Sequence, residues 1–234
     1  MNKPRKTWSR ARTAGLLYLT IIACGMYAEV AVRSQLVVAD DPEATANNVL
    51  DCSGLFRSAL LADLVMMLCD VALAVLLYQL LRPLSRTLSL LAAAFRMTQT
   101  AVIALNLLNM FLALKILGGT SYTDAFRIEQ QHAIAMLLLD AHKYGYVLGL
   151  AFFGVGTLII AYLACKARPI PRTIGVLLVL AGIGYLADCI TFLVLPGYDG
   201  SVSPILLAPA LLGELAFAIW LLAKGQCLET LAPR

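Results

Sequence analysis

Six long apolar stretches, separated by short polar segments, dominate the pattern of hydrophobic and polar residues along this 234-residue chain. A helix needs about 20 mostly apolar residues to cross the hydrocarbon core of a bilayer, and a soluble core has no use for six such runs. The stretches predict membrane-spanning helices over residues 14–31, 55–81, 88–117, 146–164, 174–195 and 204–223.

The pattern therefore predicts an all-α fold, a polytopic membrane protein built as a bundle of six transmembrane helices. Every segment between the spans is too short to fold alone, so we expect a single integral membrane domain over residues 1–234. In the longest segment outside the membrane, Asp41 precedes Pro42, and proline is favoured at the first position of a helix. A short outer amphipathic segment is expected there.

Lysine and arginine residues are concentrated in alternate loops of this topology. Short loops rich in these residues stay in the cytoplasm, which predicts that both termini are cytoplasmic, in agreement with an even number of spans. The first apolar run is long and no small-residue cleavage site closes it, so it is interpreted as a retained span and not as a signal peptide. The basic residues expected on the cytoplasmic side are Lys3, Arg5, Lys6, Arg10, Arg12, Arg82, Arg86, Lys166, Arg168, Arg172, Lys224 and Arg234. The charged residues expected on the opposite side are Arg33, Arg57, Lys115 and Arg127 with Glu29, Asp40, Asp41, Glu43, Asp51, Asp124, Glu129 and Asp199.

The formal net charge of +4 does not indicate a nucleic-acid partner, because the basic residues lie at membrane boundaries, where they meet anionic lipid headgroups. Membrane lipids are therefore the expected partners. The six cysteines include no C-x-x-C pair and only Cys52 lies clearly in an outer loop, so no disulfide framework is expected. Motifs of nucleotide-binding loops, serine hydrolases and zinc proteases are absent. The sequence predicts no cofactor and no metal.

Ionisable residues inside the spans are the strongest functional signal, because each costs at least a few kcal/mol to place in a membrane. Asp70, Arg96 and Glu214 lie ten to twelve residues from the basic residues that mark the cytoplasmic ends of their spans. At about 1.5 Å per residue, all three lie roughly 15–18 Å above the cytoplasmic boundary. A buried arginine needs a carboxylate partner, so we expect these three residues to form a structural ion cluster. Such a cluster either fixes the register of the helices or contributes to function.

A second set of polar residues lies nearer the outer surface, at about 24–35 Å by the same count. Neither Asp63 nor Asp188 has an evident cation at its level, so each carboxylate must take up a proton or reach water. We expect the two to face one another across an outward-opening pocket, with His142 and Tyr144 at its mouth. The candidate ligand-binding residues are Asp63, Asn106, Asn109, His142, Tyr144 and Asp188.

These residues also have structural interpretations. Asn106 and Asn109 are typical of amides that hydrogen-bond between membrane helices, at about 0.6–2 kcal/mol each. His142 is typical of a surface histidine at the boundary between a helix and the headgroups. With Asp140 it could instead form half of an acid–base or metal site, although His132, ten residues away, does not share its face as a metal pair would.

Short motifs distributed over all six spans point to a family. They are Ala14-Gly15-Leu16-Leu17-Tyr18, Leu55-Phe56-Arg57, Asp63 and Asp70, Leu77-Tyr78 to Leu81-Arg82-Pro83, Phe95-Arg96 with Asn106-Leu107-Leu108, Pro171 to Asp188 with Leu195-Pro196, and Gly213-Glu214-Leu215-Ala216-Phe217 through Trp220-Leu221-Leu222 to Lys224-Gly225. With these residues the chain resembles, over nearly its whole length, the bacterial membrane family catalogued as domain of unknown function 4386. The resemblance implies a six-helix protein of the bacterial cytoplasmic (inner) membrane, and the family's name assigns no activity. His142 followed by Tyr144 also resembles the family pattern, whereas Gly156 or a neighbour replaces a second histidine, which speaks against histidine-based metal chemistry.

Three classes of function remain open on the sequence. The favoured prediction is binding or translocation of a small polar solute, an ion or a lipid headgroup through an intramembrane polar cavity. The second is an intramembrane lipid-modifying enzyme that uses Asp63, Asp188 and His142, against which the scarcity of metal ligands speaks. The third is a non-catalytic assembly or regulatory subunit, in a homo-oligomer or a membrane complex, whose polar residues only hold the bundle together.

Overall fold

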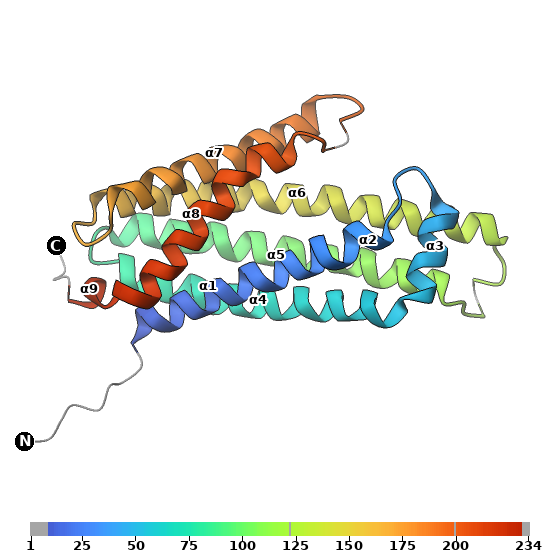
Figure 1. Cartoon of the computed structure of the whole chain (residues 1–234), viewed down its shortest axis with the longest axis horizontal. Coiled ribbons are helices and arrows are strands. Elements are labelled where there is room, and N and C mark those ends of the chain that lie inside the picture. The colour runs from blue at the N-terminus through green and yellow to red at the C-terminus, as the bar shows by residue number, and fades with distance from the viewer. Residues whose placement is uncertain (1–8, 122, 199, 231–234) are drawn as a thin grey trace, which may run out of the picture. The chain divides into compact units, whose positions relative to one another are not determined.

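The computed structural model describes residues 9–121, 123–198 and 200–230 (Figure 1). Within these residues the chain is helical and has no β-strand. Five charged residues used above, Lys3, Arg5, Lys6, Asp199 and Arg234, lie outside the described part of the chain. The elements in chain order are α1 (Arg10–Met26), the π-helix η1 (Tyr27–Arg33), α2 (Ser34–Leu36), α3 (Pro42–Asp51), α4 (Ser53–Leu81), α5 (Arg86–Leu117), α6 (Ile128–Lys166), α7 (Arg172–Val194), α8 (Ser203–Lys224) and α9 (Gln226–Glu229).

The predicted fold class is confirmed, because six of the described helical segments are long and apolar enough to cross a membrane. For four of them the predicted and observed ends differ by at most two residues. The first span is longer than predicted, since α1, η1 and α2 together continue to Leu36. The fourth predicted span forms the second half of α6, a helix of 39 residues that begins at Ile128. That length is roughly 58 Å, about twice the hydrocarbon core, so hydropathy marks only part of this helix.

The short helix expected before the second span is α3. The carboxylate of Asp41 accepts a hydrogen bond from the Ala44 backbone N–H at 2.9 Å, and Pro42 occupies the first turn. Asn48 connects α3 to the end of the first span, since its side chain donates to the carbonyl of Leu36 at 3.2 Å. The Thr45 hydroxyl hydrogen-bonds the backbone of Val38, just after that span. These hydrogen bonds hold the segment between the first two spans against the first span.

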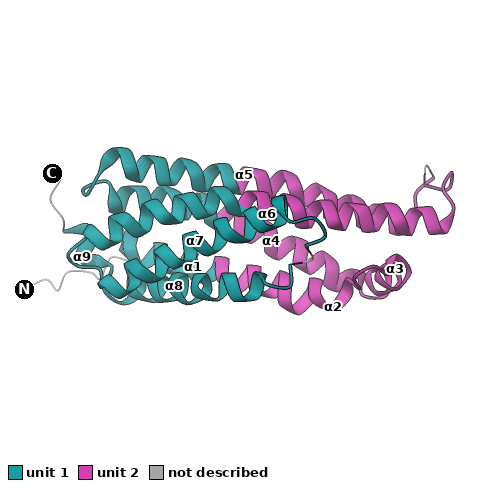
Figure 2. Cartoon of the chain, turned by 90° about the horizontal axis from the view of Figure 1, so that it is seen from above, with its two compact units in different colours: residues 1–20, 69–99, 150–234 teal, residues 21–68, 100–149 magenta. Residues whose placement is uncertain are grey.

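The chain divides into two compact units, which Figure 2 distinguishes. Unit 1 comprises residues 1–20, 69–99 and 150–234, and unit 2 comprises residues 21–68 and 100–149. The helices α1, α4, α5 and α6 each contribute residues to both units. That the chain forms one integral membrane domain stays a prediction.

Unit 2 has an apolar core to which η1, α2, α3, α4, α5 and α6 all contribute. Phe56 of α4 is completely buried, and Met110 of α5 is 1% exposed. The π-helix takes part through Ala28 and Val32, both completely buried. The polar residues of unit 2 described below lie on these same helices and not in loops.

Unit 1 is organised around α7 and α8, which pack closely along their lengths. At Gly184 the α7 backbone approaches the carbonyl oxygen of Leu206 so closely that a Cβ atom would overlap it. Helix α1 packs on α8 through an edge-to-face contact of Tyr18 and Phe217, with ring centroids 6.2 Å apart. The Ala11 backbone N–H also donates to the Glu229 carboxylate at 2.9 Å. The start of α1 and the helix α9 thus lie at the same end of unit 1, as an even number of spans requires.

Candidate functional site

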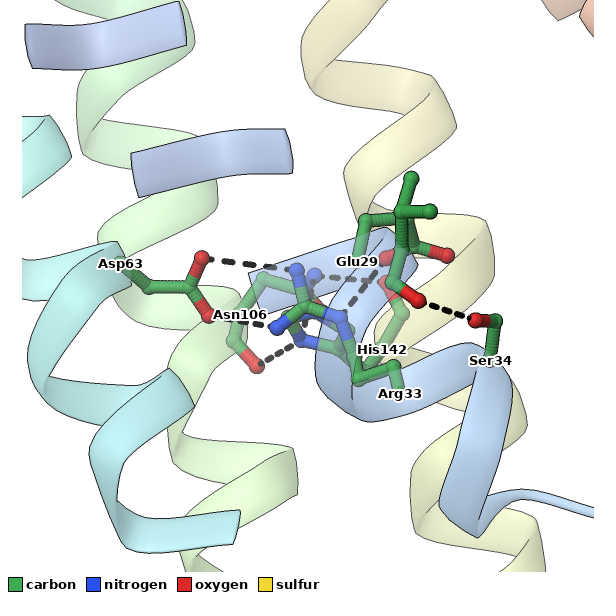
Figure 3. A network of polar contacts seen from close by, with 7 residues as sticks. Glu29, Arg33, Ser34, Asp63, Asn106 and His142 are labelled. Atoms are coloured by element: carbon green, nitrogen blue, oxygen red, sulfur yellow. Dashed lines mark hydrogen bonds and ion pairs between the residues drawn. The ribbon is translucent and has the colours of Figure 1, made fainter. Parts of the chain in front are cut away.

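Unit 2 contains a buried arginine–aspartate pair that joins the first span to α4 (Figure 3). Arg33 Nη1 donates to Asp63 Oδ2 at 2.6 Å, and Nη2 to Oδ1 at 3.4 Å. On the other side of the guanidinium, Nε donates to Glu29 Oε2 at 2.7 Å. Arg33 is 7% exposed and Asp63 1% exposed, whereas 68% of the Glu29 side chain is exposed. One cation therefore connects a buried carboxylate to one that reaches the surface of the unit.

The expectation that Asp63 has no cation at its level is wrong. Sequence analysis placed Arg33 in an outer segment, because the first apolar run ends before it. In the structure the helix continues to Leu36 and keeps Arg33 within it, where it contacts Asp63. The sequence feature that could have indicated a helix through Arg33 is the four-residue spacing of Glu29 and Arg33, since residues four apart lie on one side of a helix and pair readily.

The segment that carries Arg33 is a seven-residue π-helix, η1. A π-helix uses i→i+5 hydrogen bonds, is rare, and occurs frequently at functional sites. The Ser34 N–H accordingly donates to the Glu29 carbonyl, and the Ser34 hydroxyl donates to the Val30 carbonyl at 2.6 Å. Tyr27 contacts Ser58 of α4, with 2.6 Å between the two hydroxyl oxygens. Contacts at both ends of η1 therefore hold this unusual backbone against α4.

Asn106 and His142 form a second polar contact in unit 2. The Asn106 side-chain amide donates to the His142 carbonyl at 2.7 Å, and its nitrogen lies 3.2 Å from His142 Nδ1. Asn109 donates to Asn106 Oδ1 at 2.9 Å. His142 is 5% exposed, so the interpretation as a surface histidine is wrong. Its ring lies close enough to Arg33 and Asp63 to interact with them electrostatically.

Four of the six predicted cavity residues thus belong to one region of unit 2. These are Asp63, Asn106, Asn109 and His142. Tyr144, from the same helix as His142, is 54% exposed and reaches the surface of the unit. The sixth, Asp188, belongs to unit 1. It is 2% exposed and accepts a hydrogen bond from the Ser203 hydroxyl at 2.5 Å. That Asp63 and Asp188 line one pocket stays a prediction.

The close approach of α5 and α6 at Asn106 depends on Gly145. A Cβ atom at Gly145 would overlap the Asn106 side-chain amide. Gly145→Ala should therefore push Asn106 away from His142 and lower the free energy of unfolding by about 1–3 kcal/mol, measured by unfolding in detergent. Gly54→Ala is the matched control, since no atom lies within 4 Å of its added Cβ. Equal stability of both variants would contradict this role for Gly145.

Unit 1 contains the second ionic contact, between Arg96 of α5 and Asp70 of α4. Arg96 Nε and Nη2 lie 2.6 and 2.5 Å from Asp70 Oδ1. The guanidinium carbon also lies 5.0 Å from the ring centroid of Tyr18 and 4.9 Å from that of Phe153. Arg96 and Asp70 are 2% and 4% exposed. The arginine is therefore enclosed by one carboxylate and two aromatic faces, a favourable arrangement for a buried cation.

Glu214 of α8 lies within electrostatic range of Arg96 and is 7% exposed. It accepts a hydrogen bond from the Tyr185 hydroxyl at 2.7 Å. Asp70, Arg96 and Glu214 thus lie in one region of unit 1, and that the three form one ion cluster stays a prediction. The sequence did not reveal the roles of Tyr18, Phe153 and Tyr185. An aromatic residue inside an apolar run contributes to the hydropathy of the span, and nothing in the run marks it as the partner of a charged side chain. Among the described residues, no three His, Cys, Asp or Glu side chains gather as a metal site would need.

The fold and these contacts define a polytopic helical membrane protein that carries a buried ionic contact in each of its two units. The chain belongs to the family described as domain of unknown function, DUF4386, whose profile matches residues 13–225. The predicted family is thereby confirmed. An uncharacterized protein of Archaeoglobus fulgidus is 29% identical over 160 residues, which cover 68% of this chain and 79% of that protein. No solved structure matches the chain.

Proposed function

We propose that this membrane protein binds a small solute with a carboxylate or phosphate group, and that Arg33 is the centre of the binding site. The observation that supports this is the environment of its guanidinium. The buried Asp63 carboxylate pairs with one edge of the guanidinium. Glu29, with 68% of its side chain exposed, pairs with the other edge. An ionisable residue in a membrane span indicates function by default, and a π-helix adds to that expectation.

The side of the Arg33 guanidinium that contacts Glu29 can release this carboxylate and bind another anionic group. Glu29 is held by one contact at 2.7 Å, and an ion pair with an exposed member contributes only about 0–1 kcal/mol. A carboxylate or phosphate of a ligand can replace Glu29 there, since arginine presents a planar set of donors that matches these groups. Asp63 remains in place and keeps the guanidinium oriented. Binding of this kind serves a transporter and a receptor equally.

A thermal-shift screen of the purified protein against small carboxylates and phosphate esters tests the proposal. A ligand at 100 times its dissociation constant stabilises the folded state by about 2.7 kcal/mol, which raises the melting temperature by roughly 5–10 °C for a chain of this size. Arg33→Lys should lose most of this shift, because lysine lacks the planar fork. Arg57→Lys, which alters an exposed arginine of the same unit, should keep it.

Glu29→Gln is expected to have the opposite effect on ligand affinity from Arg33→Lys. Removing the competing carboxylate should tighten binding and leave the fold intact, so the shift should appear at lower ligand concentration. A shift that Arg33→Lys leaves unchanged, or that Glu29→Gln abolishes, would contradict the proposal.

A purely structural subunit is the second candidate. It is supported by the pairing of Arg33 with carboxylates on both of its edges, since a buried pair can serve only to fix helix register. In that case no solute shifts the melting temperature, and Glu29→Gln lowers the stability of the free protein.

We further infer that the protein lies in the cytoplasmic membrane with both termini in the cytoplasm. The concentration of Lys and Arg in alternate loops supports this orientation. Reporter domains fused after Arg168 should be active as cytoplasmic reporters, and those fused after Gly200 as reporters of the outer side. A reversed pattern at either site would show that the orientation is wrong.

A further inference from the structure

Unit 1 carries an open apolar groove of about 400 Å³ along α5 and α6. Its volume lies within the range of small-molecule sites. Leu88 of α5 contributes from one side. The α6 residues are spaced as one face of a helix, and they are Val155, Leu158, Ile159 and Tyr162. The Tyr162 hydroxyl is the polar group among these side chains, so the groove suits a hydrocarbon chain.

The two helices run in opposite directions along this groove. Phe95 of α5 contacts Phe152 of α6, with ring centroids 6.4 Å apart, and Ala92, one turn earlier in α5, lies beside Gly156, one turn later in α6. The first residue of α5, Arg86, and the last residue of α6, Lys166, therefore lie towards the same end of the groove.

That end is positively charged. Lys166 is exposed, and its Nζ lies 4.4 Å from the ring centroid of Tyr162, which lines the groove. Arg86 is exposed and stands two residues before Leu88. Neither α5 nor residues 141–166 of α6 contain an Asp or Glu. The groove thus ends at two cations with no acidic residue on either of its walls.

We propose that the groove binds an anionic phospholipid, whose acyl chain lies along Val155, Ile159 and Tyr162 and whose phosphate pairs with Arg86 and Lys166. The distance from Val155 to Tyr162 along the helix is roughly 10 Å, which fits within one leaflet of a hydrocarbon core about 30 Å thick. Basic pockets between membrane helices are known to hold anionic headgroups. This site is separate in sequence from the Arg33 network and does not depend on the proposed solute.

The test measures binding of phosphatidylglycerol and phosphatidylcholine to the full-length protein in nanodiscs or mixed micelles. Wild type should prefer phosphatidylglycerol. The double variant Arg86→Gln/Lys166→Gln should lose roughly thirtyfold in affinity for phosphatidylglycerol, about fivefold for each cation near a headgroup, with little change for phosphatidylcholine. The matched control is Arg82→Gln/Arg172→Gln, which removes the same charge from two other exposed arginines of unit 1 and should keep the preference.

Ile159→Trp tests the apolar part of the site without changing its charge. The indole should fill the groove and displace the phospholipid even though Arg86 and Lys166 remain. If the two double variants lost the same affinity for phosphatidylglycerol, the general surface charge would explain the preference, and the proposal would be overturned. Unchanged phosphatidylglycerol binding by Ile159→Trp would overturn it as well.

Discussion

Replacing Arg96 with alanine is expected to lower the free energy of unfolding by about 3–5 kcal/mol, because it leaves the buried Asp70 carboxylate without its cation. Arg96 is 2% exposed and lies 2.5–2.6 Å from Asp70 Oδ1. The substitution also removes the group between the Tyr18 and Phe153 rings and leaves a space that neighbouring side chains fill only in part. Chemical unfolding in detergent, followed by circular dichroism, measures the loss.

The appropriate control is Arg172→Ala, since Arg172 is an exposed arginine of the same unit. Its stability should stay within about 0.5 kcal/mol of wild type. Arg96→Lys should fall between the two, because it keeps the charge but loses the planar contact with the aromatic rings. If Arg96→Ala were as stable as the control, the Asp70–Arg96 contact would not be a buried ion pair.

The Arg33–Asp63 pair allows a sharper experiment, because binding and stability can be separated there. Arg33→Ala should cost about 3–5 kcal/mol, since it leaves the buried Asp63 carboxylate without its cation. Asp63→Ala should cost less, because Arg33 keeps its contact with Glu29. The double variant Arg33→Met/Asp63→Leu replaces the pair by apolar side chains of similar volume. Such replacements are often neutral or stabilising, so this variant should lie within about 1 kcal/mol of wild type.

The same double variant should fold but show no thermal shift with any carboxylate or phosphate ligand, because the group proposed to bind them is absent. A double variant as unstable as the sum of the two single variants would mean that the charges do not interact. A double variant that keeps a ligand-induced shift would place the solute site elsewhere.

Hydropathy alone determined the class of this protein and most of the boundaries of its six spans. The apolar runs identified the helices α4, α5, α7 and α8 to within two residues at each end, because the cost of exposing polar groups to lipid acts on each span independently. Counting residues from the basic loops also predicted one common level for Asp70, Arg96 and Glu214, since the rise of an α-helix is constant. Motifs spread from Ala14 to Gly225 indicated the family, and the family profile matches residues 13–225.

The partner of each buried charge was decided only by the tertiary structure. Asp63 contacts Arg33 because the first helix continues through a π-helical segment to Leu36, past the end of the apolar run. His142 is buried because α5 and α6 approach closely at Gly145. The position of a residue along its helix can be counted from the sequence of that helix alone. Which side chain it contacts depends on how two helices are rotated and packed against each other, and many side chains together set that packing.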